Sequence, residues 1–192
     1  MAKIKFDFSK SPLSAKEILD YYTHVVSAIE CKYSQDGNKN YTTDFLGYSE
    51  VKVKSEKNLL LKELSVEASL CLLSFIESRF RIDFIIRCQR RKKDSLSTDF
   101  RAIYNPAKRL YTYSLTDDII ENWKKNMPEQ KDTFDRLVDA FKYRNWVAHG
   151  RYWHFKDNPN KFTFNAIWML NEKIDVILEG KILTLLNVGE SL

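Results

Sequence analysis

Residues 55–91 read SEKNLLLKELSVEASLCLLSFIESRFRIDFIIRCQRR, and this stretch decides the fold. Its apolar side chains occur on almost every side of a helix with 3.6 residues per turn. A helix that is apolar nearly all round is buried on most sides, so we predict one long central helix here. The other segments of the chain are expected to pack around it.

The composition of the whole chain favours an all-α protein. The 192 residues are 44% hydrophobic and 30% charged, and they include only five glycines and four prolines. This length is enough for one well-buried core, and neither an internal repeat nor a shift in composition marks a second domain. We therefore predict a single domain over residues 1–192, a helical bundle of about five to seven helices.

Capping residues and apolar spacing mark the shorter helices. Ser14 followed by Glu17 has the pattern of a capping box, which starts a predicted helix that runs to about Lys32. Further helices are expected at residues 95–108, 116–127 and 162–186.

Two segments depart from the helical pattern. Residues 1–13 include the alternating run Lys-Ile-Lys-Phe-Asp-Phe, which predicts either a short strand or an N-terminal arm laid on the core. Residues 33–54 contain Asp-Gly and a cluster of Asn and Thr, which are typical of turns. We therefore predict a loop insertion there, with room for a small hairpin that ends in Val51 and Val53.

The charge and the cysteines narrow the class of protein. A formal net charge of +5 favours an anionic partner. Cys31, Cys71 and Cys88 form neither a disulfide framework nor a zinc-ligand pattern, so we predict reduced, buried thiols in a cytoplasmic protein. An apolar signal segment and a run of about 18 uncharged apolar residues are both missing, which predicts no contact with a membrane. We expect neither a metal nor an organic cofactor, because their motifs are missing too.

The strongest candidate for a functional site is KYRNWVAHGRYW, residues 142–153. It falls at the end of a helix predicted over residues 129–149, which the following glycine ends. At about 100° per residue, Arg144 and His149 lie on opposite shoulders of the apolar stripe of this helix, with Asn145 near its centre. The two are about 7.5 Å apart along the axis. A phosphate fits this gap if a second surface packs over the stripe.

These residue types suit the cleavage of RNA without a metal ion. That reaction needs a base for the 2′-hydroxyl proton, a cation for the charge at phosphorus and an acid for the departing 5′ oxygen. His149 can be base or acid near neutral pH, Arg144 can present a planar fork to the phosphate, and Asn145 can hydrogen-bond the imidazole or the phosphate. One histidine cannot be acid and base in the same step, so the chemistry predicts a homodimer. The alternative is a histidine that only caps its helix.

Charged residues on the central helix are further candidates. Glu63 and Glu77 are carboxylates on a helix predicted to be buried, so they need partners, and Arg81 or Arg144 can pair with Glu77. A solvated helix face is an equal alternative. Residues 87–93 hold five cations in seven positions, which either follow a nucleic-acid backbone or stabilise the C-terminal end of the helix.

The run RNWVAH, residues 144–149, resembles the Arg-x4–6-His signature of the HEPN domains (higher eukaryotes and prokaryotes nucleotide-binding). The resemblance implies an all-α bundle of a family rich in dimeric, metal-independent endoribonucleases from toxin–antitoxin, abortive-infection and CRISPR systems. It implies catalytic roles for Arg144, Asn145 and His149, with Glu77 facing them from an earlier helix. It also implies a role in phage defence and restraint by an antitoxin or another regulatory protein. Contacts with RNA are then expected from Lys142, Arg151, Tyr152, Arg90 and Arg91.

A second reading is a non-catalytic HEPN-like module that binds a nucleotide, an RNA or a protein. Arg144 and His149 facing a shared basic cleft in a dimer would favour the enzyme, whereas a separated or salt-bridged pair would favour the binding module. Base stacking is a further expected role for Tyr143, Trp146 and Trp153. A purely structural reading would bury residues 134–148 within the monomer.

Overall fold

The computed structural model describes residues 13–90, 92–105, 108 and 112–182, and within them it contains helices and no strand. The all-α prediction is therefore confirmed for this part of the chain, while the predicted arm at residues 1–12 lies outside the described residues. The α-helices are α1 (Ala15–Lys32), α2 (Tyr41–Asp44), α3 (Glu50–Gln89), α4 (Ser95–Ile103), α5 (Glu121–Asn126), α6 (Lys131–Ala148) and α7 (Phe164–Leu178). Short π and 3-10 segments are η2 (Leu115–Ile120), η3 (Pro128–Gln130) and η4 (Pro159–Phe162).

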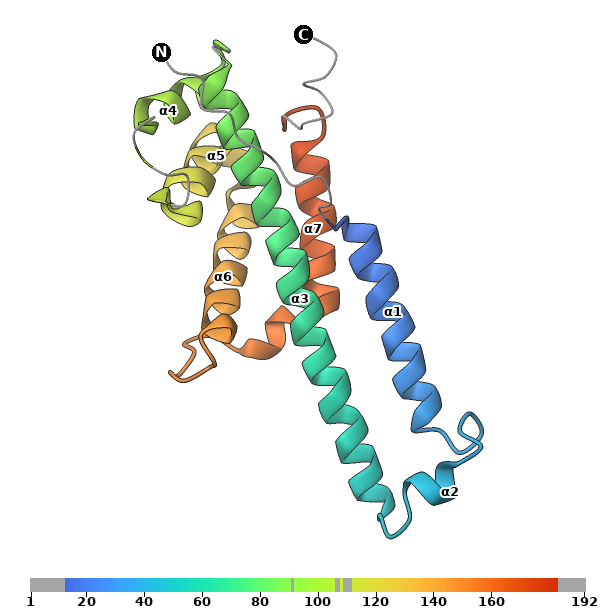
Figure 1. The fold of residues 1–192 in the computed structure, drawn as a ribbon. Helices are drawn as coiled ribbons and strands as arrows, with labels where there is room; N and C mark the ends of the chain where they lie inside the picture. Colours follow the sequence, from blue (N-terminus) through green and yellow to red (C-terminus); the bar gives the residue numbers. More distant parts are fainter. Residues whose placement is uncertain (1–12, 91, 106–107, 109–111, 183–192) are drawn as a thin grey trace.

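Helix α3 is the axis of the molecule. It runs for 40 residues, with α1 and α7 on one side and α4, α5 and α6 on the other (Figure 1). Its C-terminal half is buried as predicted, and the side chains of Leu72, Ile76 and Phe80 are fully inaccessible to solvent. The main core therefore forms around this half of α3.

The N-terminal half of α3 corrects the prediction of a helix that is buried on most sides. Leu59 is 59% exposed and Leu60 is 42% exposed. In Figure 1, α1 is the one long helix beside this half, and the pair projects beyond the rest of the bundle. Apolar residues on every side of a helix do not guarantee that another helix packs on every side, and among the described residues α1 is the one long helix that packs along this half.

Helix α1 begins as its capping box predicts. The backbone N–H of Ser14 donates to Oε2 of Glu17 at 2.7 Å, and the backbone N–H of Glu17 donates to the Ser14 hydroxyl at 3.2 Å. Of the apolar stripe on this helix, only Ile18 is fully buried, because α1 packs mainly against the projecting half of α3.

The predicted loop insertion is shorter than expected, and the small hairpin is wrong. Ser49 caps α3, which begins at Glu50, so Val51 and Val53 belong to a helix. Val53 packs with Tyr33 and Phe45 in a small second cluster at the tip of the α1–α3 pair. This packing favours the helix at Val53 over the strand that its local propensity suggests, whereas Val51 is exposed in the first turn of the helix.

The three cysteines are free, as predicted, but two of them are not buried. Cys31 and Cys71 are exposed, and Cys88 is partly buried. Burial raises the pKa of Cys88 to about 12. Helical sequence around a cysteine therefore did not determine whether the thiol faces the core.

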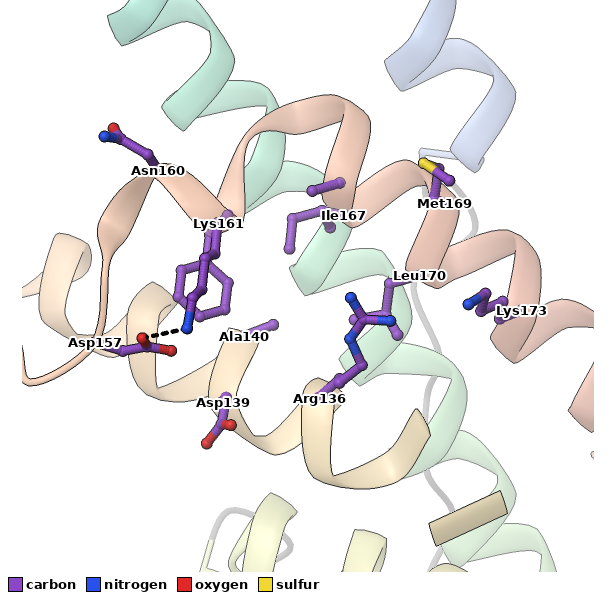
Figure 2. A pocket seen from close by; sticks show the side chains of 12 residues that line it. Arg136, Asp139, Ala140, Asp157, Asn160, Lys161, Ile167, Met169, Leu170 and Lys173 are labelled. Carbon is purple, nitrogen blue, oxygen red and sulfur yellow. Dashed lines mark hydrogen bonds and ion pairs between the residues drawn. The ribbon is translucent and has the colours of Figure 1, made fainter. Parts of the chain in front are cut away.

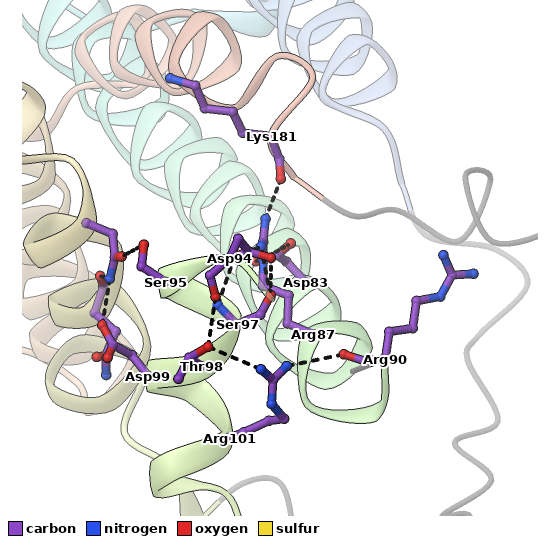
Figure 3. Close-up of polar contacts among 12 residues, drawn as sticks. Asp83, Arg87, Arg90, Asp94, Ser95, Ser97, Thr98, Asp99, Arg101 and Lys181 are labelled. Carbon is purple, nitrogen blue, oxygen red and sulfur yellow. Dashed lines mark hydrogen bonds and ion pairs between the residues drawn. The ribbon is translucent and has the colours of Figure 1, made fainter. Parts of the chain in front are cut away.

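Arg87 is the centre of a buried polar network that joins three segments (Figure 3). Its Nε donates to both carboxylate oxygens of Asp83 at 2.8 and 2.9 Å, and its Nη1 donates to Asp94 at 2.9 Å and to Ser97 at 3.1 Å. Its Nη2 donates to the carbonyl oxygen of Lys181, just after α7. The network ties the C-terminal end of α3 to the start of α4 and to the end of the last helix.

Candidate functional site

Arg144 is held by a carboxylate on α3. Its Nη2 lies 2.8 Å from Oε2 of Glu77, and the Nε of Arg81 lies 2.6 Å from Oε1 of the same carboxylate. Arg81 also donates from Nη1 to the carbonyl oxygen of Tyr113 at 3.2 Å. The predicted partners of Glu77 are therefore both present. Two guanidinium groups share one carboxylate, so this cluster has a formal charge of +1.

The cluster is partly accessible to solvent. The side chain of Arg144 is 29% exposed and that of Glu77 is 15% exposed. Glu77 uses one oxygen for each arginine, which leaves the other nitrogens of Arg144 available to an anion at the surface. Shared pairing of this kind orients a guanidinium without cancelling its charge.

The end of α6 is exposed where the sequence predicted the centre of an apolar stripe. Phe134 and Leu137 are fully buried, but Asn145, Ala148 and His149 are exposed. The main core reaches the last turns of α6 through Tyr143, Trp146 and Val147, which lie on a different side of the helix from Asn145. The position of Asn145 at the centre of a buried stripe is therefore wrong within the monomer.

The last turns of α6 pack against the segment that follows the helix, through Tyr143 and Trp146. The ring of Tyr143 stacks on Phe162 with centroids 4.8 Å apart, and Trp146 stacks on Phe155 at 5.2 Å. The indole N–H of Trp146 donates to the carbonyl oxygen of Trp153 at 2.7 Å. Tyr143 is buried and Trp146 is covered by Phe155, so neither is free to stack on a base as predicted.

His149 is the C-terminal cap of α6 and is exposed. Its backbone N–H donates to the carbonyl oxygen of Asn145 at 3.1 Å, and its ring centroid lies 6.1 Å from that of Trp153. Within the described part of the chain, the imidazole makes no hydrogen bond or ion pair. The predicted hydrogen bond from the Asn145 amide to the imidazole is therefore missing in the monomer. Gly150, with φ of 81°, ends the helix as predicted.

Of the residues expected to contact RNA, Arg151 and Lys142 are already in ion pairs, whereas Tyr152 is exposed. Arg151 makes a bidentate pair with Glu63, with its nitrogens 3.0 and 2.7 Å from the two carboxylate oxygens. This pair links two candidates that the sequence analysis did not connect, and the hydrogen bonds from Arg151 lower the pKa of Glu63. Lys142 pairs with Asp139 at the surface at 2.8 Å. Tyr152 is exposed, so it keeps the accessibility that stacking requires.

Arg87 and Arg90, from the basic run at residues 87–93, do not join this site. Arg87 is buried in the network of Figure 3, which contradicts its reading as an RNA contact. Arg90 caps α3 and lies about 20 Å along the helix axis from Glu77, at 1.5 Å per residue. Arg91 lies outside the described residues.

Exposed residues of α3 and of the end of α6 lie, along the chain, between the residues of two ion pairs, Glu77–Arg144 and Glu63–Arg151. On α3 they are Glu67, Cys71 and Ser74, which follow one another at spacings of four and three on one side of the helix. On α6 they are Asn145, Ala148 and His149. The Glu77–Arg144 pair joins α3 to α6, and the Glu63–Arg151 pair joins α3 to the turn after α6; together with the exposed residues they make up one candidate surface. We call it the α3–α6 face.

The described residues contain no metal-binding cluster and no membrane-spanning helix, and known proteins offer no match. Among the residues that the structure describes, no cluster of three or more His, Cys, Asp or Glu side chains is arranged to hold a metal ion. No helix in the described ranges combines the length and apolarity needed to cross a membrane. Comparisons with protein-family models, with curated proteins and with solved structures find no match to this chain.

Proposed function

We propose that this chain is a metal-independent endoribonuclease of the HEPN type that acts as a homodimer through the α3–α6 face. The observation that carries the proposal is the Arg81–Glu77–Arg144 cluster, with the exposed His149 five residues after Arg144 at the end of the same helix. A partly exposed, oriented guanidinium and an unpaired imidazole on one helix end are the groups that phosphodiester transfer needs. A second subunit would supply the other histidine.

The proposed reaction uses one His149 as the base and the His149 of the second subunit as the acid. The base takes the proton of the 2′-hydroxyl, whose oxygen attacks phosphorus, and the bond from phosphorus to the 5′ oxygen breaks as the acid protonates that oxygen. The products are a 2′,3′-cyclic phosphate and a free 5′-hydroxyl. Arg144 stabilises the charge on the non-bridging oxygens, and Glu77 positions Arg144.

Such an enzyme cleaves cellular RNA unless it is restrained. We therefore propose that it acts in the cytoplasm, in phage defence or in a toxin–antitoxin system, under the control of an antitoxin or another regulatory protein. This part of the proposal rests on the family resemblance of residues 144–149.

The ion pair between Glu77 and Arg144 also favours a second candidate function, a non-catalytic module that binds RNA or a nucleotide. A guanidinium that already has a carboxylate partner binds phosphate less strongly than a free one. The imidazole of His149 also has no orienting partner among the described residues, and an oriented base is normally held by a third group.

Cleavage of a single-stranded RNA in EDTA distinguishes the two functions. We expect the wild-type protein to produce 2′,3′-cyclic phosphate ends, and Arg144→Ala to lower the cleavage rate by about a hundredfold or more. Glu77 keeps Arg81 as its partner in this variant, so the fold is expected to persist. An inert wild-type protein that still binds the RNA would support the binding module. Equal cleavage by Arg144→Ala would assign the activity to a contaminating nuclease.

The proposed dimer makes a separate prediction at Ala148. This small, exposed side chain lies between Asn145 and His149 on the α3–α6 face, so Ala148→Glu would place a charge inside the dimer interface. We expect sedimentation analysis to show a dimer for the wild-type protein and a monomer for Ala148→Glu, with cleavage lost. Ala28→Glu on the exposed side of α1 is the matched control and should remain dimeric. A monomeric wild-type protein would contradict the shared cleft.

A further inference from the structure

A groove lies between α6, η4 and α7, away from the candidate RNA site (Figure 2). Its volume is about 610 Å³, and its floor consists of buried apolar residues of all three segments, including Ala140, Phe162 and Leu170. Arg136 on its rim is nine residues from Asn145 on the same helix, which is half a turn out of phase at about 100° per residue. The exposed residues of α6 on the α3–α6 face, Asn145, Ala148 and His149, are about 120° to 180° around the helix from Arg136.

The charges of the groove are unbalanced at one end. Lys161 pairs with Asp157 at 2.7 Å, and Asp139 pairs with Lys142 at 2.8 Å. Arg136 from α6 and Lys173 from α7 are left without an acidic partner among the described residues. Figure 2 shows both side chains beside Leu170. An occupant of this groove meets two uncompensated positive charges next to an apolar floor.

An exposed apolar ridge extends the groove along α7. Met169 is 61% exposed and Val176 is 74% exposed, with Lys173 between them on the same side of the helix. Met169 and Val176 are seven residues apart, which is two helical turns or about 10.5 Å. A ridge of this length beside a groove between two helices matches the contact surface of a third helix, and exposed methionine is common where a surface accepts a helix.

We propose that this groove docks an acidic amphipathic helix of a partner protein. Apolar side chains of that helix at i, i+3 or i+4 and i+7 contact the floor and the ridge of Met169 and Val176. Glutamate or aspartate side chains on the flank of the helix pair with Arg136 and Lys173. Charge complementarity decides the class of occupant, because a neutral or basic helix leaves both cations unpaired in a partly desolvated site.

Methyl NMR on methionine gives a direct test, because the chain has only three methionines and the two that the structure describes have different surroundings. Met169 is exposed on the ridge, whereas Met127 is buried in the main core and is an internal control. The probe is a synthetic amphipathic helical peptide with leucine on one face and glutamate on its flanks, together with a twin in which lysine replaces every glutamate. We expect the glutamate peptide to shift the Met169 resonance with a Kd of about 10 µM, and the Met127 resonance to stay in place.

The charge-reversed double variant Arg136→Glu with Lys173→Glu supplies the matched control. Both side chains are exposed, so circular dichroism should match that of the wild-type protein. We expect this variant to bind the glutamate peptide at least about tenfold more weakly and to gain affinity for the lysine twin. RNA cleavage should not change, because neither residue lies on the α3–α6 face.

Three results would overturn the proposal. The first is a Met169 resonance that does not move at saturating glutamate peptide. The second is equal affinity of the wild-type protein for both peptides, which would show that Arg136 and Lys173 do not select the partner. The third is a shift produced by laurate but not by the glutamate peptide, which would assign the groove to a small anionic amphiphile.

Discussion

His149→Ala is expected to lower RNA cleavage by at least about a hundredfold, because removal of a general acid or base costs a factor of that size or more. The same substitution should change the free energy of unfolding by less than about 1 kcal/mol, which is the size of the interaction between a histidine and the C-terminal end of a helix. The small effect on stability follows from the exposure of His149, whose imidazole makes no hydrogen bond or ion pair among the described residues. Cleavage rates and urea unfolding of the same preparations measure both effects.

A second histidine in the neighbouring loop gives a matched control for this prediction. His154 is also exposed and is five residues further along the chain, so His154→Ala removes an imidazole from the same region without touching the end of α6. It should cleave RNA at the wild-type rate. If His149→Ala retains full activity, or if both variants lose activity equally, His149 is not the acid or the base.

Two features that depend on residues close together in the sequence were predicted correctly. The capping box of Ser14 and Glu17 starts α1 as expected, because its hydrogen bonds join residues three positions apart. The pair of Glu77 and Arg81 was predictable for the same reason, since residues four apart on a helix face each other. The contact of Glu77 with Arg144 was only one of the pairings that the need of a buried carboxylate for a partner allowed, because it joins two helices that are distant in the sequence.

Features that depend on distant contacts were not predictable from the chain alone. Periodicity placed Asn145 at the centre of a buried stripe, but the aromatic residues of the loop after α6 draw a different side of its last turns into the core. The exposed N-terminal half of α3 is a similar case, because the apolar pattern that includes Leu59 and Leu60 does not determine which helices pack against it. Arg87 belongs to a basic run, a pattern typical of a surface. Its burial depends in part on a hydrogen bond to the carbonyl oxygen of Lys181, 94 residues away.

The largest effect on stability is expected from Arg87→Met, which keeps most of the side-chain volume but removes the guanidinium. Asp83 is fully buried, so the variant leaves a buried carboxylate without its main cation. Breaking a buried pair in this way costs about 3–5 kcal/mol of unfolding free energy. For a chain of this length that corresponds to a fall in Tm of about 10 °C, measured by circular dichroism or calorimetry. Arg136→Met, at an exposed position, should change the unfolding free energy by less than about 0.5 kcal/mol.

The physical cause of this loss of stability can be tested by also removing the buried carboxylate of Asp83. If the penalty comes from the loss of the ion pair with the buried Asp83 carboxylate, the double variant Arg87→Met with Asp83→Leu should regain much of the stability, because apolar residues often replace a buried ion pair without loss. Burial opposes the ionisation of Asp94, but hydrogen bonds from Ser97 and the charge of Arg87 outweigh it and lower its pKa. The contribution of the Asp94 carboxylate to the free energy of unfolding is therefore present above its unfolded pKa of about 3.9. It is lost as the pH falls through the lower pKa that Asp94 has in the folded protein. The difference in stability between the wild-type protein and Arg87→Met should narrow below about pH 4, whereas a constant difference would mean that lost packing, not lost charge, destabilises the variant.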